Sequence, residues 1–308
     1  MWIGSYFHKV NYKDEINDLF NEVSKKLIGW GISGKIVSLE CIDRKRNAPT
    51  GVGSEFLMNR ALGDWAENQV LKALEEKFQE YVPTKYGNSD NIVAGDPNFK
   101  LFFQGYVNEL IQLGKRPDIL IFQKGESRGV SPDISNEKTN LLNDLVRKAS
   151  YGIEVRSSKI SVKKYNQFKK QNKGKNSSRN ELSITPKVED LPLVVKWITT
   201  FGVPHYYFQV CLDEVYGISF RRILEFVLNS EKKGIVERNR NNAEKATIHV
   251  PFSMATKIGE FKEKVNFDLE IYEDERGRIN PYAIPKDGKL DLEKEALINC
   301  LKDSHFSF

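Results

Sequence analysis

The amino-acid sequence predicts an α/β fold in which short buried strands alternate with amphipathic helices. Apolar residues recur with helical spacing over residues 55–78 and 191–201. Runs of Ile, Leu, Val and Phe bounded by Gly or Pro occur at 116–122, 151–159 and 205–210, and such runs are typical of buried strands. A chain of 308 residues with 40% hydrophobic content can bury a large core around these elements.

The N-terminal region supplies secondary structure and no candidate chemistry. A helical pattern lies around residues 16–27 and ends at the Gly29-Trp30-Gly31 turn, and residues 35–39 have the composition of a short strand. No internal repeat and no low-complexity linker divides the chain. We therefore expect one elaborated domain over residues 1–308.

Several functional classes find little support in the sequence. No run of eighteen apolar residues and no basic-then-apolar start is present, so we expect a soluble, cytoplasmic protein. The three cysteines are widely separated and odd in number, which argues against a disulfide framework or a CxxC zinc site. The four histidines are not spaced as ligand pairs, and no phosphate-binding glycine motif occurs.

The positive charge of the chain is concentrated in one segment. The net charge is +5, yet residues 159–179 hold eight basic residues and no acid, so the rest of the chain is slightly acidic. Such a patch fits a polyanionic partner, and a solvated flexible loop is the alternative. The basic residues are Lys159, Lys163, Lys164, Lys169, Lys170, Lys173, Lys175 and Arg179.

Two of the apolar strand-like runs each carry an acidic residue, although a buried carboxylate is costly unless it is compensated. Asp118 follows Pro117 in the first run, and Glu154 lies within the second. On adjacent strands they would hold one or two Mg²⁺ ions, with the Val155 carbonyl and waters completing the ligand shell. Glu67 lies on or beside the buried face of the 55–78 helix, where it is either a third acid of the site or a residue covering the core edge.

The pairing of Pro117-Asp118 with Glu154-Val155-Arg156 resembles the PD-(D/E)xK nuclease superfamily. Longer blocks are similar to type II restriction endonucleases of the AccI family, and they cover roughly half of the chain, from about Gly63 to Phe220. The resemblance implies a restriction-endonuclease-like core with a mixed five-stranded sheet between helices. The matching blocks are 63–67, 116–118, 153–158, 187–191 and 205–210.

The same resemblance implies an activity and a set of partners. We expect a Mg²⁺-dependent, sequence-specific endonuclease that acts on double-stranded DNA as a homodimer at a near-palindromic site, with a cognate DNA methyltransferase as a separate protein. Within the single domain, residues 1–54 would form a helical extension, 55–220 the catalytic core, and 221–308 a DNA-recognition and accessory region. A structure-selective repair or junction nuclease of the same superfamily is one alternative, and a non-cleaving DNA-binding protein is another.

One residue departs from the superfamily pattern, because Arg156 stands where lysine is usual. A guanidinium stays charged, so we expect Arg156 to orient the attacking water or to stabilise charge on the phosphate rather than to remove a proton. Lys187 would supply the missing amine if its strand lies beside the site. The structural alternative for Arg156 is an ion pair with Glu154 on the same strand face.

DNA contacts are expected from three groups of polar residues. Ser157 and Ser158 follow the candidate site as phosphate hydrogen-bond donors, and the basic segment extends from them. Base-edge contacts are expected from residues 172–179 and from a second polar loop, since Arg, Asn and Lys pair with purine edges, although flexible surface loops share this composition. The second loop contributes Asn239, Arg240, Asn241, Asn242 and Lys245.

Overall fold

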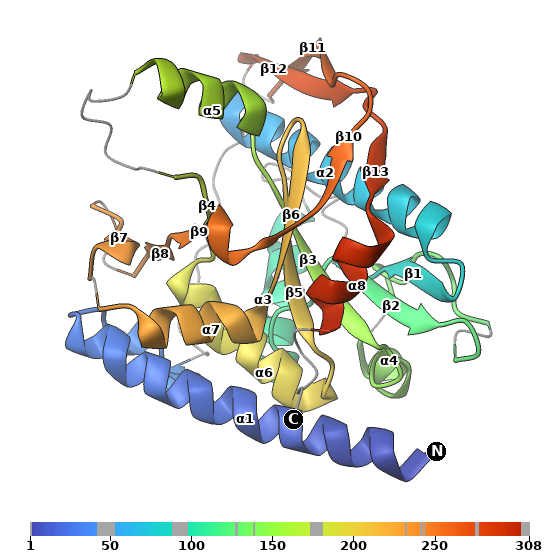
Figure 1. Cartoon of the computed structure of the whole chain (residues 1–308), viewed down its shortest axis with the longest axis vertical. Helices are drawn as coiled ribbons and strands as arrows, with labels where there is room; N and C mark the ends of the chain where they lie inside the picture. The colour runs from blue at the N-terminus through green and yellow to red at the C-terminus, as the bar shows by residue number, and fades with distance from the viewer. Residues whose placement is uncertain are drawn as a thin grey trace.

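A mixed seven-stranded sheet forms the centre of the molecule in the computed structural model (Figure 1). The parallel pair is β3 with β5, and the other neighbouring strands run antiparallel. The structure describes residues 2–41, 53–87, 98–126, 129–137, 139–172, 181–231, 233–240, 242, 244–274 and 277–302. In spatial order the strands are β1 (Tyr81–Lys85), β2 (Ile119–Gln123), β3 (Tyr151–Ser157), β5 (His205–Val210), β6 (Glu214–Ser219), β10 (Thr256–Phe261) and β13 (Leu290–Leu292).

Helices cover both faces of this sheet, and each face has its own hydrophobic core. Because side chains alternate along a strand, Leu120 and Phe122 of β2 enter one core while Ile119 and Ile121 enter the other. The first core lies under α1 (Trp2–Gly29), α6 (Leu191–Phe201) and α7 (Phe220–Asn229), with α1 lying across the other two (Figure 1). The second lies under α2 (Ser54–Lys77) and α8 (Lys294–Lys302).

The remaining elements surround this centre. In the parts of the chain that are described, no helix is both long and apolar enough to cross a membrane. The other helices are α3 (Phe99–Leu113), α4 (Thr139–Val146) and α5 (Val162–Gln171), with short 3₁₀ turns η1 (Gly34–Ile36), η2 (Leu39–Cys41), η3 (Val188–Asp190), η4 (Lys233–Ile235) and η5 (Phe252–Met254). Three two-stranded sheets pair β4 (Ser183–Ile184) with β9 (Val250–Pro251), β7 (Val236–Arg238) with β8 (Ala246–Ile248), and β11 (Asn266–Glu273) with β12 (Ile279–Lys286).

The α/β class and the helices expected at 55–78 and 191–201 are confirmed. The expected number of five strands is wrong, since the C-terminal strands β10 and β13 extend the sheet to seven. The strand expected at 35–39 is also wrong, because this segment forms η1 and η2. Ile36 and Val37 are both buried in the same core, and consecutive residues of a strand point to opposite faces. Residues 162–171 of the basic segment form α5 rather than a loop.

Candidate active site

The strand register brings Asp118 and Glu154 side by side. β2 runs antiparallel to β3 with Ile119 paired to Ile153, so the next step of the ladder sets Asp118 opposite Glu154. Asp118 lies immediately before β2, and its Oδ2 accepts a hydrogen bond from the Val155 backbone N–H at 2.6 Å. Two residues on neighbouring strands thus present carboxylates to one place, as the sequence predicts.

Glycine at position 87 permits this arrangement. The backbone N–H groups of Tyr86 and Gly87 donate to the Asp118 carbonyl at 2.8 and 2.9 Å, which holds the β1 end against the start of β2. A Cβ atom at Gly87 would lie 2.9 Å from the Asp118 Cα and 3.0 Å from its Oδ1. A larger residue would therefore displace the carboxylate.

Glu154 is buried, with 3% of its surface exposed, and its two carboxylate oxygens differ in environment. Oε1 accepts a hydrogen bond from the Lys115 Nζ at 2.5 Å and lies 3.6 Å from Nη1 of Arg156. Oε2 is buried without a hydrogen-bond partner in the described part of the chain. A buried carboxylate oxygen is normally satisfied, so Oε2 is an open position for a cation or a water molecule.

The pKa of Asp118 is raised well above its ordinary value, first by burial and then by the negative charges of Glu154 and Glu67. Lys115 and the Val155 N–H oppose this shift in part. Glu67 on α2 is thereby close enough for its charge to act on Asp118. The crowding of negative charge favours a bound cation.

Lys115 belongs to this cluster although the sequence reasoning did not select it. Its Nζ also lies 3.3 Å from Oδ2 of Asp190, the residue before α6. Burial alone would lower the pKa of Lys115, but Glu154 and Asp190 raise it well above its ordinary value. The signal available in the sequence was its position three residues before Asp118, within the Gly114-Lys115-Arg116 segment, whose composition is typical of a turn.

Arg156 lies on the same strand face as Glu154, and the ion pair considered from the sequence is present, with Nη1 3.6 Å from Oε1. A second nitrogen, Nη2, lies 3.5 Å from the Thr185 carbonyl. Burial acts to lower the pKa of Arg156, but the negative charges of Glu154 and Asp190, with smaller contributions from Tyr207 and Asp118, together outweigh it and raise the pKa. Arg156 therefore carries a fixed positive charge beside Glu154.

Lys187 is placed differently from the expectation. It is exposed at the start of η3, and its backbone forms an isolated antiparallel bridge with Thr247. No described contact joins Lys187 to Asp118 or Glu154. Asp190, the last residue of η3, contacts Lys115 instead.

A cavity of about 480 Å³ opens beside the candidate site. Arg156, Ser157 and Ser158 line it from β3 and the residue after it, and Tyr165 lines it from α5. The start of α5 is fixed by Asp213, which accepts hydrogen bonds from the Ser161 hydroxyl at 2.6 Å and from two backbone N–H groups. The two serines predicted as DNA contacts thus face a concave, polar surface next to the acids.

The predicted basic residues that the structure describes lie on α5 and just before it, and none of them is among the residues that line the cavity. Lys163, Lys164 and Lys170 are exposed on α5, Lys169 lies over the Tyr165 ring at 5.8 Å, and Lys159 is exposed before the helix. Lys173, Lys175, Arg179 and Asn241 lie outside the described residues. Asn239, Arg240, Asn242 and Lys245 are exposed at the tip of the β7–β8 hairpin, as is Glu244.

The β7–β8 hairpin is attached to the η3 turn. The Ala246 N–H donates to Oε2 of the buried Glu189 at 3.2 Å. Glu189 precedes Asp190, which contacts Lys115. The predicted base-contacting loop is therefore connected through two consecutive acidic residues to the candidate site.

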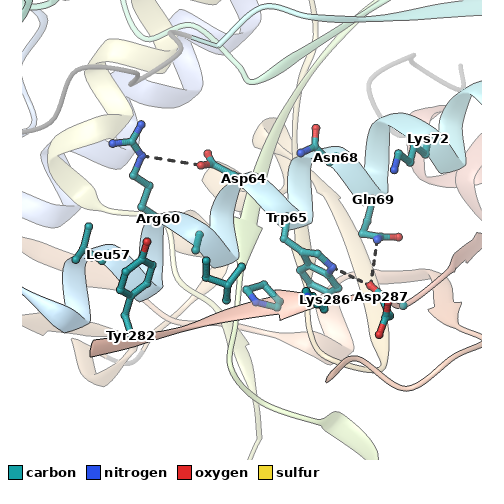
Figure 2. A pocket seen from close by; sticks show the side chains of 14 residues that line it. Leu57, Arg60, Asp64, Trp65, Asn68, Gln69, Lys72, Tyr282, Lys286 and Asp287 are labelled. Atoms are coloured by element: carbon teal, nitrogen blue, oxygen red, sulfur yellow. Dashed lines mark hydrogen bonds and ion pairs between the residues drawn. The ribbon is translucent and has the colours of Figure 1, made fainter. Parts of the chain in front are cut away.

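A larger cavity, of about 740 Å³, lies between α2 and β12 (Figure 2). Arg60 and Asp64 form an ion pair of 3.9 Å in it, and the Trp65 Nε1 donates to the Asp287 carbonyl at 3.0 Å. None of the predicted site residues lines this cavity. Its hydrogen bonds attach the C-terminal β-structure to α2, and we assign it no chemistry.

The carboxylates form a pair rather than a larger metal-binding group. Among the residues with assigned positions, no three His, Cys, Asp or Glu side chains are grouped closely enough to hold a metal ion. Mg²⁺ is commonly bound through one or two carboxylates, with water and phosphate oxygens as its other ligands. Asp118 and Glu154 could therefore contribute the two carboxylates of such a site, together with the Val155 carbonyl expected from the sequence.

Comparison with known families bears on the whole chain. A family model described as AccI restriction endonuclease matches residues 11–178 and 166–308, which together span most of the sequence. No curated protein and no solved structure matches the chain. The family match extends well beyond the blocks of the sequence resemblance, into both the N-terminal helix and the C-terminal strands.

Proposed function

The chain belongs to the AccI restriction endonuclease family, and we propose that it is a type II enzyme making Mg²⁺-dependent double-strand cuts at a specific, near-palindromic DNA sequence. Family membership supports a DNA substrate and a role in restriction and modification, with a separate methyltransferase protecting host DNA. The observation that carries the proposed chemistry is the juxtaposition of Asp118 and Glu154 on neighbouring strands. This pair agrees with the PD-(D/E)xK pattern.

The donor set of the cluster fits Mg²⁺. Asp118 and Glu154 would hold the ion together with the Val155 carbonyl, since Mg²⁺ prefers oxygen ligands. The unpartnered Oε2 of Glu154 and the raised pKa of Asp118 both indicate negative charge that a cation would compensate. When bound, such an ion neutralises phosphate charge and lowers the pKa of water.

The side chains around the pair have distinct roles in this proposal. Glu154 holds Lys115 and Arg156 on its Oε1 side, so positive charge is fixed next to the position of the phosphate. Arg156 cannot serve as a base, and its charge stabilises the negative charge that develops on the phosphate oxygens. Glu67 adds negative charge next to Asp118 and strengthens the preference for a cation there.

The DNA would lie over the cavity of Arg156, Ser157 and Ser158, between α5 and the β7–β8 hairpin. Figure 1 shows these two elements on the same side of the sheet, with β4 between them. The exposed lysines of α5 provide phosphate contacts, and the polar tip of the hairpin provides side chains for base edges. The rest of the chain is slightly acidic, which favours binding through this surface alone.

The β11–β12 hairpin supports the homodimer. It projects away from the central sheet (Figure 1), and one of its faces carries Phe267, Leu269, Ile271 and Ile279, which are 45–72% exposed. The other face of the hairpin packs against α2, so this apolar face is left uncovered, and an uncovered apolar face of this kind is typical of a protein interface. The partner is a second copy, because a twofold axis matches two equal DNA half-sites.

The charge of the hairpin argues against DNA as the occupant of this face. Its described acids are Asp268, Glu270, Glu273 and Asp274, and its described bases are Arg278 and Lys286, so it would repel phosphate. Leu269→Lys should convert the protein from dimer to monomer in sedimentation velocity, while Lys286→Glu, on the opposite face, should leave the dimer intact. A wild-type monomer in both the presence and absence of DNA would contradict the assignment.

One incubation tests the activity. Purified protein, Mg²⁺ and a long linear DNA should give discrete bands on a gel, and Asp118→Ala or Glu154→Ala should abolish cutting while DNA binding persists. Cutting of branched DNA alone would indicate a repair nuclease, and a mobility shift without cutting would indicate a DNA-binding protein. Continued cutting by either alanine variant would disprove the site assignment.

A further inference from the structure

We propose that Lys115 is a catalytic residue that donates a hydrogen bond to the phosphate being cut, and that Asp190 is the residue that positions it. The inference rests on the proposed nuclease function. It identifies a lysine for the role that is open because Arg156 stands where the superfamily usually has lysine. It starts from the place of the Lys115 ammonium, 2.5 Å from Glu154 and 3.3 Å from Asp190.

The hydrogen bonds of Lys115 leave one donor for a substrate. An ammonium group has three N–H donors. In the described structure, Oε1 of Glu154 and Oδ2 of Asp190 accept from two of them. The Lys115 side chain is 19% exposed, so the residue lies at the edge of the cluster and is not fully enclosed by it. A phosphate oxygen next to Glu154 is a natural acceptor for it.

The backbone around Lys115 is held as firmly as its side chain. Its N–H donates to the Leu193 carbonyl in the first turn of α6 at 3.0 Å. Gly114, which ends α3, has a φ of 87°, and a Cβ there would lie 2.3 Å from the same carbonyl oxygen. The start of α6 therefore fixes Lys115 at both ends, through Leu193 at the backbone and Asp190 at the ammonium.

Such fixation suits a group that stabilises a transition state. A donor held in place before the substrate arrives loses little entropy and needs little reorganisation when charge develops. Arg156 is less well suited to direct donation, since its guanidinium is divided between Glu154 at 3.6 Å and the Thr185 carbonyl at 3.5 Å. Lys187 is exposed at the start of η3, and no described contact joins it to Glu154.

The test compares Lys115→Met, which keeps the length of the side chain, with Lys115→Arg, which keeps its charge. Lys148→Met, at an exposed position outside the cluster, is the matched control. At saturating Mg²⁺, Lys115→Met should lower the single-turnover cleavage rate by about 100-fold or more, the usual effect of removing one transition-state donor. Lys115→Arg should restore part of the rate, and Lys148→Met should match wild type.

Two further measurements separate catalysis from a structural role. DNA affinity with Ca²⁺ should stay within about threefold of wild type, and calorimetry should show that Ca²⁺ affinity does not fall, since Glu154 loses a competing cation. If Lys115→Met fails to fold, Asp190→Asn provides the second test, with an expected rate loss of about tenfold and unchanged DNA affinity.

The outcomes distinguish this inference from the proposed function. Failure of wild-type protein to cut DNA would overturn both. Cutting by wild type, loss of cutting in Asp118→Ala and a normal rate in Lys115→Met would overturn the role of Lys115 alone. A loss confined to DNA affinity in Lys115→Met would likewise assign Lys115 to binding and reject its part in catalysis.

Discussion

Replacement of Asp118 by asparagine should abolish cutting and at the same time stabilise the metal-free protein. Asp118 is held near Glu154 and Glu67, and its raised pKa reports that its negative charge is unfavourable in the folded state. Asparagine has nearly the same shape, carries no charge and can still accept the hydrogen bond from the Val155 N–H. The substitution therefore removes the repulsion and keeps the packing.

The expected change in the free energy of unfolding is the sum of two opposing contributions. The 2.6 Å bond from Val155 becomes a bond to a neutral oxygen, which costs about 1 kcal/mol. Removing a crowded, poorly compensated charge should contribute about 2–3 kcal/mol. The net gain is about 1–2 kcal/mol, and for a chain of this size that raises the melting temperature by about 2–4 °C.

The sign of the pH dependence gives an independent check. Because the pKa of Asp118 is raised on folding, the folded protein binds this proton more tightly than the unfolded chain does. Stability from this group is present at low pH and is lost as the pH rises through the folded-state pKa. The advantage of Asp118→Asn in EDTA should therefore grow from pH 5 toward pH 8.

The assay is thermal denaturation of wild type and Asp118→Asn in EDTA and in Ca²⁺, across that pH range. Ca²⁺ should raise the melting temperature of wild type through binding to the folded state and should have little effect on the variant. Asp144→Asn, at a highly exposed position on α4, is the control. A lower melting temperature for Asp118→Asn in EDTA, or an undiminished response to Ca²⁺, would refute the reasoning.

Three further predictions concern the surroundings of the acids. Glu67→Gln should lower the cleavage rate by about tenfold and keep DNA binding, since Glu67 acts on Asp118 through its charge; an unchanged rate would remove it from the site. Lys164→Ala and Lys170→Ala should each weaken DNA binding and reduce the slope of log affinity against log salt by about 1, and an unchanged slope would exclude α5 from the interface. Gly114→Ala should destabilise the fold by about 3 kcal/mol or more in denaturant titrations, because Gly114 has a positive φ and an added Cβ would clash with the Leu193 carbonyl. Gly125→Ala is the control, since an added Cβ there meets no atom within 4 Å. Equal stabilities of the two variants would contradict the backbone conformation described for Gly114.

Sequence periodicity predicted those elements whose apolar pattern is local. The stripe of α2 and the apolar face of α6 repeat with helical spacing, β2 is a short apolar run that follows Pro117-Asp118, and β3 contains Ile153 and Val155 on either side of Glu154. β10 and β13 lack such a pattern, and their pairing joins residues far apart in the chain. Sheet membership of this kind depends on tertiary contacts, which override local preference.

Some residues of the candidate site could likewise be predicted from the sequence, and others could not. Asp118 and Glu154 were found because a carboxylate within an apolar strand is conspicuous by itself. Lys115 was not found, because Gly114-Lys115-Arg116 has the composition of an exposed turn, and its burial comes from Glu154 and from the distant first turn of α6. The contacts of Asp190 with Lys115 cross 75 residues of sequence, a distance over which spacing carries no information.

Under the proposed function, the formal charges of the described cluster give Lys115 a role that Arg156 alone does not fill. Asp118, Glu154, Glu67 and Asp190 contribute four negative charges, and Lys115 and Arg156 contribute two positive ones. A divalent cation brings the total to zero, so an incoming phosphodiester meets no net repulsion. Without Lys115 the loaded cluster would be negative, and both substrate binding and the additional charge of the transition state would be opposed. In this proposal a lysine is therefore needed for charge balance. In this chain that lysine is Lys115, which lies three residues before Asp118.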